Sequence, residues 1–232
     1  MKLLRTSAAV AAVAAGMGLA VQAADVSEET RDVGSFDEVY LKGSMDVEVR
    51  VGKEQSVRVV ADSDIIHHLE TEVRGGELHI GLERGNYRNI KKMVVYVTVP
   101  SLKAAGIYGS GDMLVEDADA DEFEIDLRGS GDAVFKDAKF GNIEMNLQGS
   151  GDIEVDGTCN TVDIELRGSG DIDADDMVCK NANVELRGSG DIEVHATDAA
   201  DISVHGSGDV VVSGSPDQLR SRVRGSGDIE MR

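Results

Sequence analysis

The chain of 232 residues carries 44 acidic and 23 basic side chains, which gives a formal net charge of −21. This charge argues against nucleic acid as a partner, because the phosphate backbone attracts basic surfaces. Four Phe, four Tyr and no Trp leave few aromatic rings for stacking a sugar. The acidic residues either keep a long β-structure soluble or attract divalent cations or a basic surface, and the composition leaves both readings open.

The first residues have the pattern of an export signal. Lys2 and Arg5 precede an apolar run that reaches Val21, and small residues follow up to Ala23. This predicts a signal peptide over residues 1–23, cleaved after Ala23, and a periplasmic or secreted protein without a transmembrane span after cleavage. Cleavage removes two basic residues and no acidic ones, so the mature formal charge is 21 − 44 = −23. Residues 24–34 are expected to be an N-terminal linker.

A single domain is predicted over residues 35–232, and its first part, residues 35–108, is irregular. Apolar and polar residues alternate on both sides of Gly43, which is typical of two strands joined at a turn. Larger coils or hairpins are expected after it, and they would cap a regular stack. Three strand candidates follow the turn: Ser56–Val60, Glu77–Leu82 and Met93–Val99.

The second part, residues 109–232, repeats the tetrapeptide Gly-Ser-Gly-Asp seven times at intervals of 18 to 20 residues. A unit of about 20 residues cannot bury an apolar face alone, so such units stack. Strands at one phase of successive coils run parallel, about 4.8 Å apart. The prediction is therefore an all-β fold, a parallel β-helix (β-solenoid) with coils of about 20 residues. The repeats begin at Gly109, Gly129, Gly149, Gly168, Gly188, Gly206 and Gly225.

Two aliphatic ladders are predicted to line the core, one on each side of the turn. The turn itself needs Gly for a positive φ, and its Asp is expected to accept hydrogen bonds from nearby amides, as in an Asx turn. The ladder two residues before each repeat glycine comprises Ile107, Leu127, Leu147, Leu166, Leu186, Val204 and Val223. The ladder directly after each Asp comprises Met113, Ala133, Ile153, Ile172, Ile192, Val210 and Ile229.

The aspartates of the turns are the candidate site residues, because they would stack in one column with carboxylates about 5 Å apart. Like charges this close repel. Calcium between turns would relieve the repulsion, although the calcium-binding Gly-Gly-x-Gly-x-Asp repeat has a nine-residue period. We favour amide hydrogen bonds together with the arginines that precede four repeat glycines, Arg128, Arg167, Arg187 and Arg224. The column comprises Asp112, Asp132, Asp152, Asp171, Asp191, Asp209 and Asp228.

Cys159 and Cys179 are the only cysteines, and each lies nine residues before the next repeat glycine. They therefore occupy one phase of adjacent coils, where a spacing of about 4.8 Å falls inside the Cα range of a disulfide. An exported protein also meets an oxidising compartment. A disulfide is predicted, with a pair of buried thiols as the alternative.

No catalytic, cofactor-binding or metal-binding motif is found in the sequence. It contains no nucleophile elbow, zinc-binding helix or phosphate loop. β-Helical polysaccharide lyases use Asp and Arg on an outer face, and the acidic strands beside the repeat arginines keep such an enzyme among the alternatives. The histidines show no metal-ligand spacing beyond one adjacent pair and are expected at the surface: His67, His68, His79, His195 and His205.

The combination of motifs resembles the putative auto-transporter adhesin, head GIN domain family of secreted bacterial proteins. The resemblance extends from Ser35 to Arg232, and its last motif is the set of Gly-Ser-Gly-Asp turns. It implies a right-handed β-helix that is exported, and it supplies no catalytic residues. The motifs that precede the turns are Phe36-Asp37-Glu38-Val39, Gly43-Ser44-Met45-Asp46-Val47-Glu48-Val49 and Val99-Pro100-Ser101-Leu102.

Three classes of function follow. The first is an exported, non-enzymatic, adhesin-like interaction protein of the bacterial envelope, whose partner is an envelope or surface component. The second is a calcium-dependent carbohydrate-binding or envelope-binding protein, and the third is a polysaccharide-modifying enzyme. A monomer or a weak end-to-end oligomer is expected, because the last coil leaves backbone groups unpaired while Glu230 and Arg232 blunt its edge.

Overall fold

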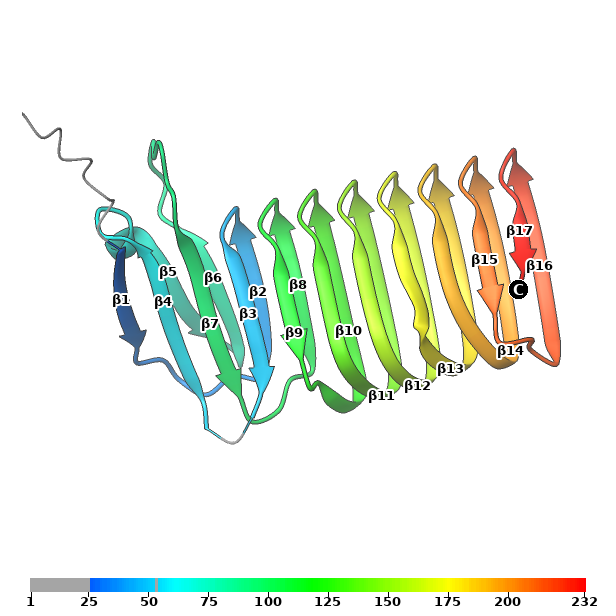
Figure 1. Ribbon diagram of the computed structural model, residues 1–232, viewed down its shortest axis with the longest axis horizontal. Coiled ribbons are helices and arrows are strands. Elements are labelled where there is room, and N and C mark those ends of the chain that lie inside the picture. Colours follow the sequence, from blue (N-terminus) through cyan, green and yellow to red (C-terminus); the bar gives the residue numbers. More distant parts are fainter. Residues whose placement is uncertain (1–25, 53) are drawn as a thin grey trace, which may run out of the picture.

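The computed structural model describes residues 26–52 and 54–232, and nearly all of its regular structure is β-strand. The strands stack side by side along the long axis of the molecule, with β1 near one end and β16 and β17 at the other (Figure 1). The predicted signal peptide, residues 1–23, lies outside the described residues.

The elements fall into an N-terminal part and a regular stack. The N-terminal part comprises β1 (Val26–Arg31), β2 (Glu38–Gly43), β3 (Asp46–Val51), β4 (Ser56–Asp62), the 3-10 helix η1 (Ile66–His68), β5 (Leu69–Arg74), β6 (Glu77–Leu82) and β7 (Met93–Val99). The stack comprises β8 (Ala104–Gly109), β9 (Met113–Glu116), β10 (Asp119–Gly129), β11 (Ala133–Gly149), β12 (Ile153–Gly168), β13 (Ile172–Gly188), β14 (Ile192–Gly206), β15 (Val210–Ser213), β16 (Gln218–Gly225) and β17 (Ile229–Met231).

Parallel pairing in the regular stack confirms the predicted β-solenoid. Equivalent residues of successive coils are direct partners, so that Gly129 pairs with Gly149 and Gly149 with Gly168. Each coil has one sharp corner, the Gly-Ser-Gly-Asp turn, and one gradual bend opposite it (Figure 1). Strand pairing continues through this bend with local irregularities, because β11 to β14 each run from the residue after one turn to the first glycine of the next while their register shifts near the bend.

Every coil therefore has two long sides that face each other across the core. We call the strand segments that lead into a turn the pre-turn side: β2, β8, β10, the C-terminal halves of β11 to β14, and β16. The segments that leave a turn form the post-turn side: β3, β9, the N-terminal halves of β11 to β14, β15 and β17.

Hairpin-like strands cap the first coil, as expected for the irregular N-terminal part. Gly43 pairs directly with Gly109, so the first two coils are neighbours although 109 − 43 = 66 positions separate them in sequence. The intervening chain adds β6 beside β2 and β7 beside β3, both parallel. Strands β5 and β4 then pair antiparallel with β6 and β7. The three predicted strand candidates are confirmed as β4, β6 and β7.

Strand β1 lies within the segment expected to be a linker, residues 24–34. It pairs antiparallel with β4, from Val26 opposite Asp62 to Arg31 opposite Val57. The side chain of Arg31 also donates a hydrogen bond to the carbonyl oxygen of Ile66 at 2.8 Å. The sequence of β1 is polar on both faces and shows no alternation, so backbone pairing and this side-chain contact define the strand instead of an apolar pattern.

Both predicted aliphatic ladders line the core. From Ile107 to Val204, the residues two before each repeat glycine are at most 1% exposed. From Met113 to Val210, the residues after each repeat Asp are at most 2% exposed. The last coil differs, because its Val223 is 42% exposed.

Both glycines of the turn are required, for two different reasons. The first glycine of each repeat turn has a positive φ between 143° and 157°, as predicted. Stacking adds a second requirement, because a Cβ on Gly149 would lie 2.0 Å from the carbonyl oxygen of Gly129. The same holds for the second glycine, where a Cβ on Gly151 would lie 2.0 Å from the carbonyl oxygen of Gly131. The coils therefore contact each other through bare backbone at this corner.

Candidate functional site

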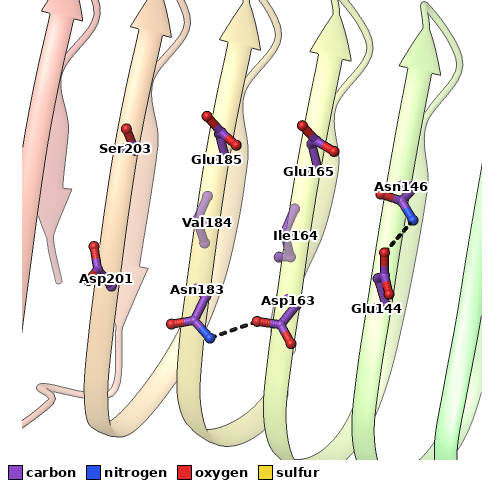
Figure 2. A pocket seen from close by; sticks show the side chains of 10 residues that line it. All are labelled: Glu144, Asn146, Asp163, Ile164, Glu165, Asn183, Val184, Glu185, Asp201 and Ser203. Atoms are coloured by element: carbon purple, nitrogen blue, oxygen red, sulfur yellow. Dashed lines mark hydrogen bonds between the residues drawn. The ribbon is translucent and has the colours of Figure 1, made fainter.

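The candidate site is the outer surface of the pre-turn side over β11 to β14, which we call the polar face. Along these strands every second residue points to solvent. Figure 2 shows the outward side chains in rows across four neighbouring strands, while Ile164 and Val184 belong to the buried core. The residues line a hollow of about 410 Å³. Its polar members are Glu144, Asn146, Asp163, Glu165, Asn183, Glu185, Asp201 and Ser203.

Contacts within the polar face occupy only part of its acceptor capacity. Asn183 Nδ2 donates to Asp163 Oδ1 at 2.6 Å, as Figure 2 shows. Nearer the turn, Arg187 Nη1 donates to Glu165 Oε1 at 2.6 Å. Each carboxylate has two oxygens that together accept about four hydrogen bonds, so most of this capacity faces solvent. The face therefore suits a partner that supplies hydrogen-bond donors and positive charge.

The predicted column of aspartates is present, but its hydrogen bonds run between coils. Asp112 Oδ1 accepts the backbone N–H of Asp132 at 3.0 Å, and Asp132 Oδ1 accepts that of Asp152 at 3.0 Å. The contact repeats to the end of the column, where Asp209 Oδ1 accepts the N–H of Asp228 at 2.8 Å. The expected Asx turn within one repeat is therefore wrong, because the amide within reach of each carboxylate belongs to the next coil.

Three of the four arginines expected to neutralise this column pair elsewhere, and Arg224 forms no ion pair among the described residues. Arg128 pairs with Asp126, while Arg167 and Arg187 pair with Glu165 on the polar face. In residues 26–52 and 54–232, no ion pair joins an arginine to the aspartate column. Backbone amides of the next coil are the hydrogen-bond partners of these carboxylates instead.

The sequence also raised two other possibilities for a site, a metal-binding group of side chains and the histidines. Across the described ranges, no three His, Cys, Asp or Glu side chains are grouped to hold a metal ion. His195 and His205 are half-buried on the outer phases of β14. The other three histidines each lie beside a glutamate: His67 with Glu29 at 3.4 Å, His68 with Glu83 at 2.9 Å and His79 with Glu77 at 3.0 Å.

A cluster of aromatic side chains on the pre-turn side was missed by sequence reasoning. The ring centroid of Tyr40 lies 5.9 Å from that of His79 and 6.0 Å from that of Tyr108. The Arg128 guanidinium lies 5.4 Å from the centroid of Tyr108. Gly106 makes room, because a Cβ there would lie 2.7 Å from Tyr40 Cδ1. The rings lie in a row along the solenoid, from β6 of the cap through β2 to β8.

Burial and nearby carboxylates shift the pKa values of this region. Burial, followed by the 2.7 Å hydrogen bond to Asp126, raises the pKa of Tyr108 to about 12. Burial likewise raises the pKa of Tyr40. The pKa of Glu124 is raised by burial first and then by the charge of Glu144. Both phenols therefore stay neutral near pH 7, and Glu124 holds its proton more tightly than a free glutamate does.

The two cysteines lie where the coil register was expected to place them. Cys159 in β12 is the direct partner of Cys179 in β13. The structure joins them by a disulfide with a Cα–Cα distance of 4.5 Å. The bond links adjacent coils near the gradual bend and lies away from the Gly-Ser-Gly-Asp corner.

Comparisons with known proteins agree with this architecture. Residues 35–216 match the family model described as "Putative auto-transporter adhesin, head GIN domain". No curated protein matches the chain. In the part of the chain that the structure describes, no helix is both long and apolar enough to cross a membrane.

Several solved structures are similar. A putative adhesin from Bacteroides fragilis NCTC 9343 has a TM-score of 0.86 at 21% identity, covering 90% of this chain and 98% of that one. A putative lipid binding protein from Parabacteroides distasonis ATCC 8503 has a TM-score of 0.72 at 26% identity, covering 90% and 97%. A putative adhesin from Parabacteroides merdae ATCC 43184 has a TM-score of 0.71 at 17% identity, covering 89% and 96%. These similarities show a shared fold.

Proposed function

The chain belongs to the putative auto-transporter adhesin, head GIN domain family, and from that premise we propose that it is an exported, non-enzymatic, adhesin-like interaction protein of the bacterial envelope. The observation that carries the proposal is the polar face, whose carboxylates, amides and hydroxyl repeat over four strands in one plane of the solenoid (Figure 2). The partner is an envelope or surface component that brings hydrogen-bond donors and positive charge to this face.

Rigid spacing supports adhesion through many weak contacts. Each exposed ion pair contributes at most about 1 kcal/mol, so one carboxylate of the face holds a partner poorly. The rows repeat at the strand spacing of about 4.8 Å, and the parallel register of β11 to β14 holds them in place. Contacts made at several rows act together because the first one raises the effective concentration of the others.

Export supports the envelope location. The leader pattern that ends at Ala23 and the disulfide between Cys159 and Cys179 both suit a protein that leaves the reducing cytoplasm. Two of the similar solved proteins carry the name putative adhesin. The polar face also favours binding over catalysis, because its chemistry varies little from coil to coil and a catalytic site needs one set of groups with different roles.

A pair of charge reversals tests the polar face. Asp163→Lys with Asp201→Lys places two positive charges on it, and binding of the protein to an envelope fraction of its own bacterium is expected to fall by about tenfold or more. The matched control is Glu154→Lys with Asp173→Lys, which changes the net charge equally but lies on the exposed post-turn side. Binding that both double variants weaken equally would show a net-charge effect and would contradict a site on the polar face.

Calcium distinguishes the second class of function. A calcium-binding aspartate column would raise the melting temperature when calcium is added, since a ligand that binds only the folded state stabilises it. The amides already bonded to each Asp Oδ1 lead us to expect the same melting temperature with calcium and with chelator. A rise that Asp152→Asn abolishes would instead support calcium-dependent binding.

A further inference from the structure

In the last coil, formed by β16 and β17, apolar residues at core positions are exposed to solvent. Three of its apolar residues, Leu219, Val223 and Met231, are 41–42% exposed, whereas their partners in the coil before are at most 3% exposed. In the described ranges, the residue-by-residue pairings of β16 are with β14 alone and those of β17 are with β15 alone. One edge of each strand therefore presents free N–H and C=O groups. Figure 1 shows β16 and β17 at the end of the stack.

The charge of this coil also departs from the rest of the acidic chain. Arg220, Arg222 and Arg224 occupy the outward phase of β16, next to Asp201, Ser203 and His205 of β14. Within the described residues, these three arginines make no ion pair and no side-chain hydrogen bond. All other arginines in strands have a carboxylate partner: Arg31, Arg50, Arg58, Arg74, Arg128, Arg167 and Arg187.

We propose that the last coil is the docking surface for a second copy of this chain. Because β16 runs into the turn and β17 runs out of it, a twofold axis along the strands brings β16 of each copy beside β17 of the other, antiparallel. Both free edges of each copy are then paired, β16 with the second copy's β17 and β17 with its β16. The exposed apolar residues of the two copies cover each other. Closed twofold contacts of this kind are the commonest form of homo-oligomer.

Two of the three arginines of β16 lie beside a carboxylate in this arrangement, while Arg220 lies beside Arg232, which follows the end of β17. The register that places Val223 beside the second copy's Ile229 also places Arg222 beside Glu230 and Arg224 beside Asp228. Glu230 has only a distant internal partner, Arg232, at 3.7 Å. Charged side chains on a free strand edge normally discourage pairing with another strand. Carboxylates on the opposing strand remove this obstacle, so β16 pairs selectively with the second copy's β17.

The opposite end of the solenoid does not offer the same surface. There η1 and the β5–β6 hairpin close the core, and Ile66 is 1% exposed. Its edge strand β5 does carry outward carboxylates, including Glu72, and a head-to-tail stack through them is the competing arrangement. Such a stack would leave Leu219 and Val223 against a polar cap, and a non-closing contact would grow into filaments.

Sedimentation velocity of the protein over a range of concentrations tests the proposal. We expect a monomer–dimer equilibrium, and Arg222→Glu or Glu230→Arg alone is expected to weaken it by about tenfold or more. Combining the two reversals restores the opposite charges and is expected to return most of the affinity. Both positions are solvent-exposed, and the melting curve of each variant reports whether it folds.

Glu72→Arg is the control for the opposite end and is expected to leave the dimer unchanged. Assemblies larger than a dimer that Glu72→Arg weakens would overturn the proposal in favour of head-to-tail stacking. A monomer at all concentrations, or a dimer indifferent to both single reversals, would overturn it as well. The proposal goes beyond the envelope-binding function and stands apart from it, because Asp163→Lys, on β12 and separated from β16 by β13 and β14, is expected to leave the dimer intact.

Discussion

Replacing Gly151 with alanine tests whether bare backbone sets the spacing of the coils. Gly151 is the second glycine of a repeat turn, and it does not need a positive φ. A Cβ added there would lie 2.0 Å from the carbonyl oxygen of Gly131, whereas real Cβ contacts essentially never fall below 3.0 Å. The two coils must therefore separate locally by about 1 Å (3.0 − 2.0).

Two hydrogen bonds beside the substitution determine its cost. Ser150 N–H donates to the carbonyl oxygen of Gly129 at 2.9 Å, and Asp152 N–H donates to Asp132 Oδ1 at 3.0 Å. A further 1 Å takes both beyond hydrogen-bonding range, and losing two such bonds costs about 2 kcal/mol. Overpacking strain adds about 1–3 kcal/mol. We expect Gly151→Ala to lower the free energy of unfolding by about 3–5 kcal/mol.

Equilibrium urea unfolding followed by far-UV circular dichroism measures this difference, and two controls separate its causes. Ser150→Ala changes an exposed side chain of the same turn and is expected to cost less than about 0.5 kcal/mol. Gly75→Ala meets nothing within 4 Å but has a φ of +67°, so it bears only the left-handed backbone cost of about 1–2 kcal/mol. If Gly151→Ala costs no more than Ser150→Ala, the coils are not stacked in register at this corner.

Three further predictions concern the core, the disulfide and pH. Leu166→Asp buries a carboxylate at a site that is 0% exposed and is expected to abolish folding. Glu165→Lys on the outer face loses only exposed ion pairs worth about 1 kcal/mol. Similar melting curves for the two variants would show that the inward and outward assignment is wrong. Alkylation of the exported, non-reduced protein followed by mass spectrometry is expected to find no free thiol at Cys159 or Cys179, and two free thiols would refute the bond. Replacing both cysteines with serine should lower the free energy of unfolding by about 3 kcal/mol. The pKa of Glu124 is raised in the folded state, so its protonation stabilises the fold below the unfolded pKa and that stability is lost as the pH rises through the folded pKa. Glu124→Gln should therefore melt higher than wild type at pH 7 and equally at pH 4, and an equal melting temperature at pH 7 would contradict the raised pKa.

The regular coils were predictable because one signal repeats in phase. Apolar residues stand at the same offset from each repeat glycine, so the stacking register follows from counting residues, and residues as far apart as Leu127 and Leu147 become direct partners. The same counting placed Cys159 beside Cys179. It assigned no direction to side chains outside the core. For this reason it did not predict that the amides bonded to the aspartate carboxylates belong to the next coil, or which carboxylates pair with the repeat arginines.

The N-terminal part was less predictable because its pairings join distant segments. Strands β4, β6 and β7 were visible from their apolar alternation, but nothing in the sequence says that β6 lies beside β2 and β2 beside β8. That order alone brings His79, Tyr40 and Tyr108 together. The one available signal for this cluster was composition. All four tyrosines precede the second Gly-Ser-Gly-Asp repeat, which begins at Gly129, whereas three of the four phenylalanines lie beyond Tyr108.

The two ends of the solenoid pose one physical problem with two solutions. A core built from identical rungs is continuous along its axis, so each end exposes apolar side chains and unpaired backbone until something covers it. At the first coil the inserted strands between Gly43 and Gly109 cover it. At the last coil the rung sequence itself changes, from the acidic outward phase of Asp163 and Asp201 to three unpaired arginines around Val223. Within the described residues these arginines form no ion pair in the stack, so we attribute the change to the contact proposed for the open end.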